Sequence, residues 1–342
     1  MRKVLVLGGA GFIGSEIVRI LSQRDGYNVT VGDSLVHGDY KGELAAYYAQ
    51  NGVTFIEEDF TQQESFDKLD DAYDDVYMLA SMIGVNNTLE NPHEVIRVNT
   101  ALIYNTLEWL KTGTAKNVLF TSTSECYSGT IDSFGYAVPT DESVPLCIAD
   151  IGHPRYTYSV TKMLGESGFL NYAKIYGFNA KIIRYNNVIG PNMGFGHILP
   201  HLVERFLKKE SPFRIYGGNQ TRAFCDIHDG AMGTIQAMEA SDYRNTTYHI
   251  GSDEEVTIED FVKEVGKHFN FDGEYVLDET YPGSVERRCP DLTKARTELN
   301  YNPSIDWRET VKRSVKWYTQ YFLETNESHF KAPSEVKKYT HG

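Results

Sequence analysis

The chain has 342 residues, of which 41% are hydrophobic and 23% are charged, so it can form one large domain or two unequal lobes. Acidic residues outnumber basic ones, with 47 Asp and Glu against 33 Lys and Arg, and the formal net charge is −14. This excess argues against a nucleic-acid partner, because a phosphate backbone is bound by a basic face. An anionic ligand would need a locally basic pocket.

No apolar run in the chain approaches the roughly 20 residues needed to cross a bilayer. The short apolar run after Met1 stops at Gly8 and lacks a small-residue cleavage site, so it is interpreted as a first strand rather than a signal peptide. We therefore expect a cytoplasmic protein without a membrane partner. The four cysteines form no C-x-x-C pair and the ten histidines show no H-E-x-x-H spacing, so neither a disulfide framework nor a metal site is indicated.

The first half of the chain alternates short β-branched runs with helical stretches, which is typical of a parallel sheet covered by helices. This pattern predicts an α/β fold with a Rossmann-type, doubly wound parallel sheet over residues 1–186. The predicted strands are 3–7, 28–32, 54–57, 75–79, 117–121 and 180–185, and the clearest predicted helices are 92–111 and 157–176.

The rhythm changes after Asn186, where a loop rich in glycine is followed by shorter, mixed elements. We expect a smaller C-terminal α/β lobe over residues 187–325, interleaved with the first domain and binding the substrate. Residues 326–342 form a polar tail. The helices predicted in this part are 199–209, 230–240, 258–269 and 307–322.

Glycines with the spacing G-x-x-G-x-x-G follow the first predicted strand and open a helix. Such a turn lets the backbone approach a pyrophosphate without Cβ atoms in the way, and the helix N–H groups then face the negative charge. The motif predicts a dinucleotide phosphate site formed by Gly8, Gly11, Phe12, Ile13 and Gly14.

Residues after the next strands fit the remainder of the same cofactor. Asp33 ends the second strand about 20 residues after the glycine loop, so it can bind the adenosine ribose hydroxyls and repel a 2′-phosphate. This favours NAD over NADP. Asp59 and Phe60, after the third strand, are candidates for the adenine, and Ala80, after the fourth, is small enough for the cofactor to pass.

Tyr158 and Lys162 lie four positions apart, so they share one face of a predicted helix. A phenol with a pKa near 10 is a poor base at neutral pH, but a neighbouring Lys⁺ and the nicotinamide charge should favour the phenolate. Tyr158 could then accept a proton from a sugar hydroxyl while hydride passes to NAD⁺. Both residues are therefore predicted to be catalytic and to contact the cofactor.

A polar cluster ends the fifth predicted strand, at the edge where doubly wound sheets bind their ligands. Thr123 could form a hydrogen bond with the reacting hydroxyl. Glu125 is a candidate acid or base, and Ser124 lies between them. The thiol of Cys126 is interpreted as a small buried side chain rather than a nucleophile.

Together these motifs resemble the extended short-chain dehydrogenase/reductase family, in its nucleotide-sugar epimerase, dehydratase and decarboxylase branch. The resemblance covers residues 4–322, and residues 184–191 resemble the family's R-x-x-N-x-x-G-P segment. It implies a nucleotide-diphosphate sugar as substrate, with Asn187 at the diphosphate. It also implies that Arg222 and Arg288 bind the substrate, which suits the bidentate pairing of guanidinium with phosphate.

Within this family, Thr123-Ser124-Glu125 and the later Arg288-x-Pro segment resemble UDP-glucuronate decarboxylases. Oxidation at C4 of a hexuronate makes a β-keto acid, which loses its carboxylate as CO₂. The similar 4,6-dehydratases carry Asp where this chain has Ser124, and UDP-galactose 4-epimerases generally lack the glutamate. A UDP-hexuronate decarboxylase is the leading interpretation. The alternatives are a 4-epimerase or related epimerase, a 4,6-dehydratase, a net oxidoreductase, and an NAD-binding protein without turnover.

Two helices carry apolar residues that could serve an assembly as well as the core. They are the predicted helices 92–111 and 157–176, with Val95, Val98, Leu102, Leu107, Met163, Phe169 and Tyr172. Family members commonly pair these helices across a two-fold axis into a four-helix bundle, so the resemblance implies a homodimer. The alternative is that both helices only cover the sheet.

Overall fold

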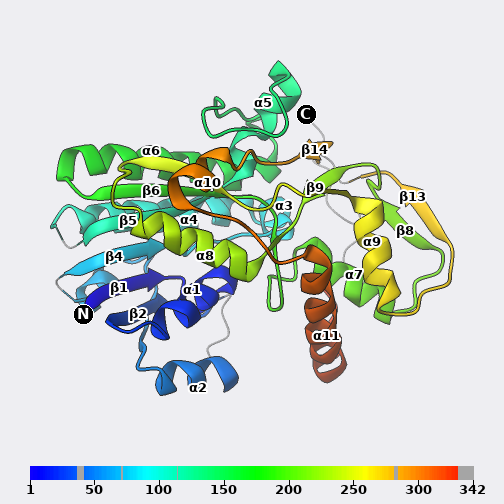
Figure 1. Ribbon diagram of the computed structural model, residues 1–342, viewed down its shortest axis with the longest axis horizontal. Coiled ribbons are helices and arrows are strands. Elements are labelled where there is room, and N and C mark those ends of the chain that lie inside the picture. Colours follow the sequence, from blue (N-terminus) through cyan, green and yellow to red (C-terminus); the bar gives the residue numbers. More distant parts are fainter. Residues whose placement is uncertain (37–41, 71, 114, 281–283, 330–342) are drawn as a thin grey trace.

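The computed structural model describes residues 1–36, 42–70, 72–113, 115–280 and 284–329. Its centre is a parallel sheet of seven strands in the order β11-β6-β5-β4-β1-β2-β3 (Figure 1). The predicted α/β fold of the Rossmann type is confirmed. The strands are β1 Arg2–Leu7, β2 Tyr27–Asp33, β3 Thr54–Glu57, β4 Tyr73–Met78, β5 Ala115–Thr123, β6 Asn179–Tyr185 and β11 Thr246–Ile250.

The strand order reverses between β1 and β4, and this reversal places the site. In open parallel sheets, ligands bind outside the carboxyl ends of the strands at such a switch point. The carboxyl ends of β1 to β5 carry most of the residues predicted to bind the cofactor or to react, and α6 carries the predicted pair Tyr158 and Lys162.

Side chains on β1 alternate between two apolar cores, one on each face of the sheet. Val4 and Val6 face a core shared with α1, α2, α8 and α10. Leu5 and Leu7 face the other core, which α4 and α6 cover. These helices, with the short α3, are α1 Phe12–Ser22, α2 Gly42–Gln50, α3 Val85–Glu90, α4 Pro92–Leu110, α6 Thr157–Tyr176, α8 Ile227–Glu239 and α10 Thr293–Leu299.

The C-terminal lobe has its own core, in which α7, α9 and α11 pack with many aromatic rings. Figure 1 shows these three helices in the lobe beside the sheet. Short strands complete this lobe and its junction with the sheet. The helices are α7 Ile198–Leu207, α9 Ile258–Lys267 and α11 Trp307–Thr325. The strands are β7 Val188–Ile189, β8 Phe213–Tyr216, β9 Thr221–Ala223, β10 Cys225–Asp226, β12 Glu255–Thr257, β13 Tyr275–Asp278 and β14 Arg287–Arg288.

The chain crosses between the two parts more than once. Both α8 and β11 follow residue 186 in the sequence, yet α8 covers the sheet and β11 is its edge strand beside β6. Segments that follow residue 186 therefore contribute both to the sheet and to its covering layer. Of the predicted polar tail 326–342, residues 330–342 lie outside the described residues.

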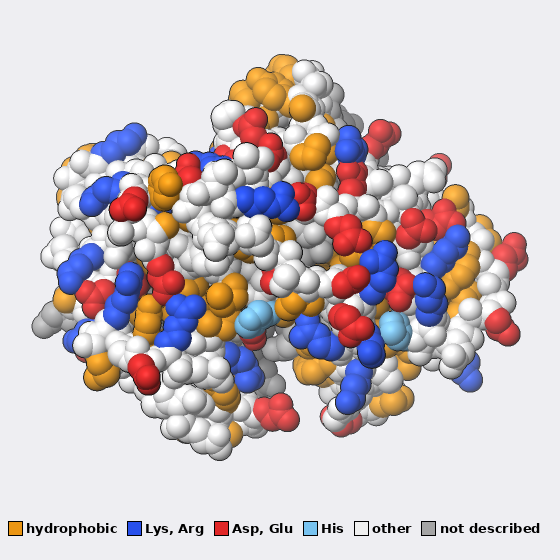
Figure 2. Space-filling model, viewed as in Figure 1, with side chains coloured by type: hydrophobic (Ala, Val, Ile, Leu, Met, Phe, Trp, Pro, Cys, Tyr) orange, Lys and Arg blue, Asp and Glu red, His pale blue; other side chains and the backbone are white. Residues whose placement is uncertain are grey.

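The surface shown in Figure 2 mixes charges of both signs. An apolar patch covers the projecting segment around α5 (Ser128–Phe134), where Phe134 is 65% exposed and Tyr136 is 44% exposed (Figure 2). Three short 3₁₀ helices connect the larger elements: η1 Gln63–Lys68, η2 Ser124–Tyr127 and η3 Pro154–Tyr156. Within the described part of the chain, no helix is both long and apolar enough to span a bilayer.

A buried ion pair ties α6 to the sheet. Arg184 on β6 donates through Nε and Nη2 to the two carboxylate oxygens of Glu166, at 2.9 and 2.7 Å. Ser122 on β5 also donates to Glu166, and both charged side chains are nearly fully buried. Because α6 carries Tyr158 and Lys162, this network fixes the position of these two residues relative to β5 and β6.

We expect Glu166→Ala to lower the free energy of unfolding by about 3–5 kcal/mol, because it leaves the Arg184 guanidinium buried without its counter-charge. Urea unfolding followed by circular dichroism measures this loss. Glu94→Ala is the control, since Glu94 pairs with Arg97 on the exposed surface of α4 and should change stability little. Equal effects of the two substitutions would contradict the role given to the buried pair.

Candidate active site

The glycine loop between β1 and α1 forms a close-fitting turn. Gly8 has φ +85°, and a Cβ there would lie 2.6 Å from the backbone N of Ala80 at the end of β4. A Cβ at Gly14 would collide with the carbonyl of Gly8. Helix α1 begins at Phe12 with Gly11 as its N-cap and no side-chain cap. The first N–H groups of the helix therefore remain for a ligand, and the turn fits a pyrophosphate.

Asp33 lies at the edge of this loop. Its carboxylate accepts hydrogen bonds from the backbone N–H groups of Ala10 and Leu35, at 3.0 and 2.9 Å. The loop is further fixed by Tyr48, whose hydroxyl donates to the carbonyl of Gly9 at 2.6 Å. The carboxylate is therefore held next to the glycine turn.

Two of the predicted cofactor residues can offer only their backbone. The ring of Phe60 is buried in the sheet core and fills the space that a Cβ on Gly32 would need. The ring of Phe12 packs toward Gly190 and the C-terminal lobe. Asp59 is exposed beside Phe60 and accepts the N–H of Thr61 at 2.9 Å, so its carboxylate remains at the sheet edge.

Tyr158 and Lys162 lie in the first two turns of α6. Lys162 is buried and donates from Nζ to the carbonyl of Thr121 on β5 at 2.8 Å. Its Nζ lies 5.5 Å from the centre of the Tyr158 ring. The lysine thus anchors α6 to β5 and also places its charge beside the phenol.

Burial changes the pKa values of this pair. Burial, together with the charges of Cys126 and Glu125, raises the pKa of Tyr158 above its ordinary value. Burial lowers the pKa of Lys162 to about 8. Among the groups of the protein, burial is therefore the largest influence on the phenol and it disfavours the phenolate, whereas the nicotinamide charge, on which the prediction also depends, is not part of this balance.

The polar residues after β5 form the next part of the site. Thr123 caps η2, because its Oγ1 accepts the backbone N–H of Glu125 at 3.2 Å. The Thr123 hydroxyl can still donate its proton to another group. Ser124 is buried, whereas the Glu125 side chain is 23% exposed.

Glu125 and Arg288 form an ion pair at the junction of the two lobes. Arg288 Nη1 donates to Glu125 Oε1 at 2.6 Å. Arg222 lies beside Arg288, because β9 and β14 pair in parallel with these two residues in register. Burial raises the pKa of Glu125, but the charges of Arg288, Arg155 and Arg222 outweigh this effect and lower it to about 2. Glu125 is therefore a carboxylate at neutral pH.

The Asn187 side chain has the character of a ligand-binding group. Its φ is +41°, a left-handed conformation that asparagine tolerates, and its carbonyl accepts the N–H of Cys225 at 3.1 Å. Its Nδ2 is buried without a hydrogen-bond partner in the described parts of the chain. Because an unsatisfied buried donor costs about 1–3 kcal/mol, this amide fits an acceptor supplied by a ligand such as a diphosphate.

Two residues near the site were missed by sequence reasoning. Arg155 lies in η3, just before the catalytic helix, and its Nη2 is 3.8 Å from Glu125 Oε1. Asn99 on α4 accepts the backbone N–H of Met82 at 2.7 Å and donates to Thr161 at 3.3 Å. The position of Arg155, three residues before Tyr158, was visible in the sequence, but its partner was not.

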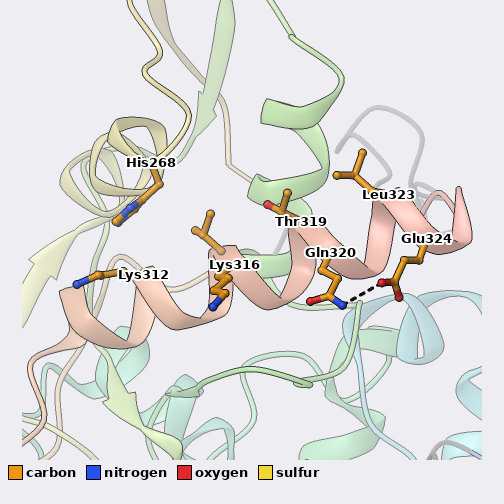
Figure 3. A pocket seen from close by; sticks show the side chains of 8 residues that line it. His268, Lys312, Lys316, Thr319, Gln320, Leu323 and Glu324 are labelled. Carbon is orange, nitrogen blue, oxygen red and sulfur yellow. Dashed lines mark hydrogen bonds between the residues drawn. The ribbon is translucent and has the colours of Figure 1, made fainter. Parts of the chain in front are cut away.

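A hollow on the C-terminal lobe lies apart from these residues. It is lined by side chains of α11 together with His268, which follows α9, and Figure 3 shows Lys312 and Lys316 there. Gln320 donates to Glu324 at 2.9 Å along the same helix (Figure 3). None of the predicted site residues lines this hollow.

Comparison with known proteins agrees with this geometry. The family model described as "NAD dependent epimerase/dehydratase family" matches residues 4–251. A Bacillus cytotoxicus protein named UDP-N-acetyl-alpha-D-glucosaminuronate decarboxylase is 29% identical over 331 residues, covering 93% of this chain and 98% of the relative.

Solved structures agree as well. The UDP-glucose 4-epimerase of Thermotoga maritima, solved with UDP-glucose, has a TM-score of 0.80 and 26% identity, covering 94% of this chain and 99% of its own. A mutant UDP-glucuronic acid 4-epimerase of Bacillus cereus, solved with UDP-4-deoxy-4-fluoro-glucuronic acid and NAD, has a TM-score of 0.80 and 25% identity, covering 93% and 99%.

These matches confirm the predicted resemblance to the nucleotide-sugar branch of the short-chain dehydrogenases, and with it an enzyme that uses NAD. The chain belongs to the NAD-dependent epimerase/dehydratase family.

Proposed function

We propose that this enzyme oxidises C4 of a nucleotide-linked hexuronate and releases the sugar carboxylate as CO₂. The observation that carries the proposal is the ion pair of Glu125 and Arg288 at 2.6 Å, directly after the strand that ends in Thr123. It places a guanidinium where a sugar carboxylate or phosphate can be bound. The Bacillus cytotoxicus relative, which is named as a uronate decarboxylase, supports the same substrate class.

The residues described above would hold the cofactor and the reacting hydroxyl. The glycine loop and Asp33 fit the pyrophosphate and the ribose of NAD. When bound, NAD⁺ supplies a reversible hydride acceptor and a positive charge. Tyr158 would accept the proton of the C4 hydroxyl, and Thr123 would orient that hydroxyl by a hydrogen bond. Lys162 would keep its positive charge next to the phenolate that forms.

The second step follows from the chemistry of the 4-keto sugar. The ketone at C4 makes the C5 carboxylate a β-keto acid, so the bond from C5 to the carboxyl carbon breaks. Its electron pair moves into an enolate on the C4 oxygen, and C5 then takes up a proton from solvent. Return of the hydride to C4, with the proton that Tyr158 accepted, would restore the C4 hydroxyl and leave the overall reaction redox-neutral. Arg288 would bind the carboxylate until CO₂ leaves. Glu125 is ionised at neutral pH, so in the observed arrangement it can accept a proton but cannot supply one.

We expect UDP-glucuronate or a related nucleotide hexuronate to lose the mass of CO₂ when incubated with the enzyme and NAD. Mass spectrometry of a panel of UDP-, GDP-, CDP- and dTDP-sugars measures this. A product of unchanged mass with a new retention time would instead show a 4-epimerase, the alternative that the two solved relatives favour. Loss of the mass of water would show a dehydratase, and accumulation of NADH would show a net oxidoreductase. The absence of any product would indicate a binding protein.

We expect Tyr158→Phe to lower turnover by about 10²–10⁴-fold, because it removes the general base. Binding of NAD should remain near that of the parent enzyme, since the glycine loop and Asp33 are untouched. Steady-state kinetics and calorimetric titration with NAD measure the two effects. Tyr156→Phe is the matched control, a buried tyrosine two residues away. Near-normal turnover of the Tyr158 variant would exclude the phenol as the base.

We also propose that the enzyme is a homodimer paired through α4 and α6. The two helices pack closely, since a Cβ at Gly168 would lie 2.7 Å from the Leu107 side chain. Of the apolar residues first considered for this interface, Val95, Leu102, Leu107 and Phe169 are buried in the core of their own chain. The helices nevertheless expose a second set of apolar side chains: Ile96, Tyr104, Leu164 and Ile175 are 46%, 57%, 48% and 74% exposed.

We expect Tyr104→Lys combined with Leu164→Lys to convert the dimer to a monomer, because two buried charges on each side would oppose association. Sedimentation velocity at micromolar concentration measures the state. Leu323→Lys is the control, as it changes a 73% exposed residue of α11 and should leave the dimer intact. A parent protein that sediments only as a monomer would overturn the proposal.

A further inference from the structure

Three arginines from three different elements surround the single carboxylate of Glu125. Arg155 belongs to η3, Arg222 to β9 and Arg288 to β14. The charges of all three act on Glu125. Three positive charges and one negative charge therefore meet at the junction of the two lobes, which leaves positive charge for an anionic ligand.

The three arginines are held differently. Arg222 is bound to backbone, because its guanidinium donates to the carbonyls of Thr221 and Val285 at 2.7 and 2.8 Å. Arg288 and Arg155 both approach the same oxygen of Glu125. Arg288 makes a direct hydrogen bond at 2.6 Å, whereas Arg155 stands 3.8 Å away. One oxygen is thus shared by a close cation and a more distant one.

We propose that Arg155 is a positioning residue that keeps hold of the Glu125 carboxylate when Arg288 turns to an anionic group of the substrate. The identity of that group as a sugar carboxylate rests on the proposed function. The positioning role itself rests on the shared oxygen and on the low exposure of the two guanidinium side chains, 14% for Arg155 and 7% for Arg288.

The physical reason is the cost of leaving a carboxylate with no close cation in a confined site. Without Arg155, release of Arg288 would leave Glu125 facing Arg222, whose charge has the smallest effect of the three on Glu125, and the phenol of Tyr158. Glu125 would then retain Arg288, and the substrate would lose that contact. With Arg155 present, Glu125 can move from one guanidinium to the other. Since η3 runs directly into α6, the carboxylate would also stay next to Tyr158.

A double-mutant cycle of Arg155→Gln and Glu125→Gln tests whether Arg155 acts through Glu125. The affinity for UDP-glucuronate is measured by calorimetry with NAD present, in a Tyr158→Phe background that prevents turnover. We expect Arg155→Gln to weaken binding about tenfold when Glu125 is present. In the Glu125→Gln background it should have no effect, because no carboxylate competes for Arg288. Arg97→Gln, on exposed α4, is the control and should change nothing.

Equal weakening in both backgrounds would overturn the proposal, because it would mean that Arg155 contacts the ligand directly. No weakening in either background would overturn it as well. Thermal unfolding of each variant shows whether the fold is retained. Arg155→Lys, which keeps the charge, should recover part of the affinity.

A second measurement needs no ligand. With ¹³C-labelled glutamate, the Glu125 carboxyl resonance, assigned by its loss in Glu125→Gln, reports the titration of that residue by NMR. The groups that face this carboxylate are Arg155, Arg222, Arg288 and Tyr158. We expect Arg155→Gln to raise the pKa of Glu125 by about one unit, because a cation near 4 Å is removed. An unchanged titration would contradict the contact.

The two hypotheses fail in different ways. An enzyme that makes no product from any nucleotide hexuronate, or does not bind UDP-glucuronate, would refute the proposed function, while the titration of Glu125 would still decide the role of Arg155. Conversely, an additive double-mutant cycle in an enzyme that releases CO₂ would refute only the role of Arg155.

Discussion

The ion pair between Glu125 and Arg288 joins two parts of the chain that are 163 residues apart in sequence. Glu125 directly follows the central strand β5, and Arg288 belongs to a strand that pairs only within the C-terminal lobe. The pair is therefore one of the contacts that position the lobe against the carboxyl edge of the sheet, together with the hydrogen bonds of Thr140 to Cys289 and Asp291. It also holds the positive charge of Arg288 near the end of β5, so the architecture and the charge of the candidate site depend on the same region.

Much of the fold could be predicted from sequence because its longer helices and strands have local sequence signals. The predicted helices 92–111 and 157–176 match α4 and α6 almost residue for residue, since Pro92 marks the first turn of α4 and Gly177, in the left-handed conformation, follows the last residue of α6. Strands β7, β9, β10 and β14, of two or three residues, have no measurable period. Strand β11 was missed because T-T-Y-H-I shows neither alternation nor a continuous apolar run.

The site was predictable where its residues are neighbours in sequence. The glycine spacing belongs to one turn and the Tyr158–Lys162 pair to one helix, so both can be recognised from residues that are close in sequence. The environment of these residues was not predictable in the same way. Burial of Tyr158 and the hydrogen bond from Lys162 to Thr121 depend on how α6 packs on β5, and this burial raises the pKa of the tyrosine. The ion pair of Arg155 with Glu125 could not be predicted either, because it depends on how η3 packs against the end of β5.

The net charge of −14 and a basic site are compatible because electrostatic range is short. At physiological salt the screening length is about 8 Å, so acidic groups on distant surfaces contribute little at the junction of the lobes. Arg155, Arg222 and Arg288 are largely buried there, where screening by solvent is weaker than at the surface. Burial and, after it, the neighbouring charge of Arg288 lower the pKa of Arg222 to about 9. An anionic ligand would offset both the loss of hydration and the repulsion between these like charges, so its binding at the junction would be favoured.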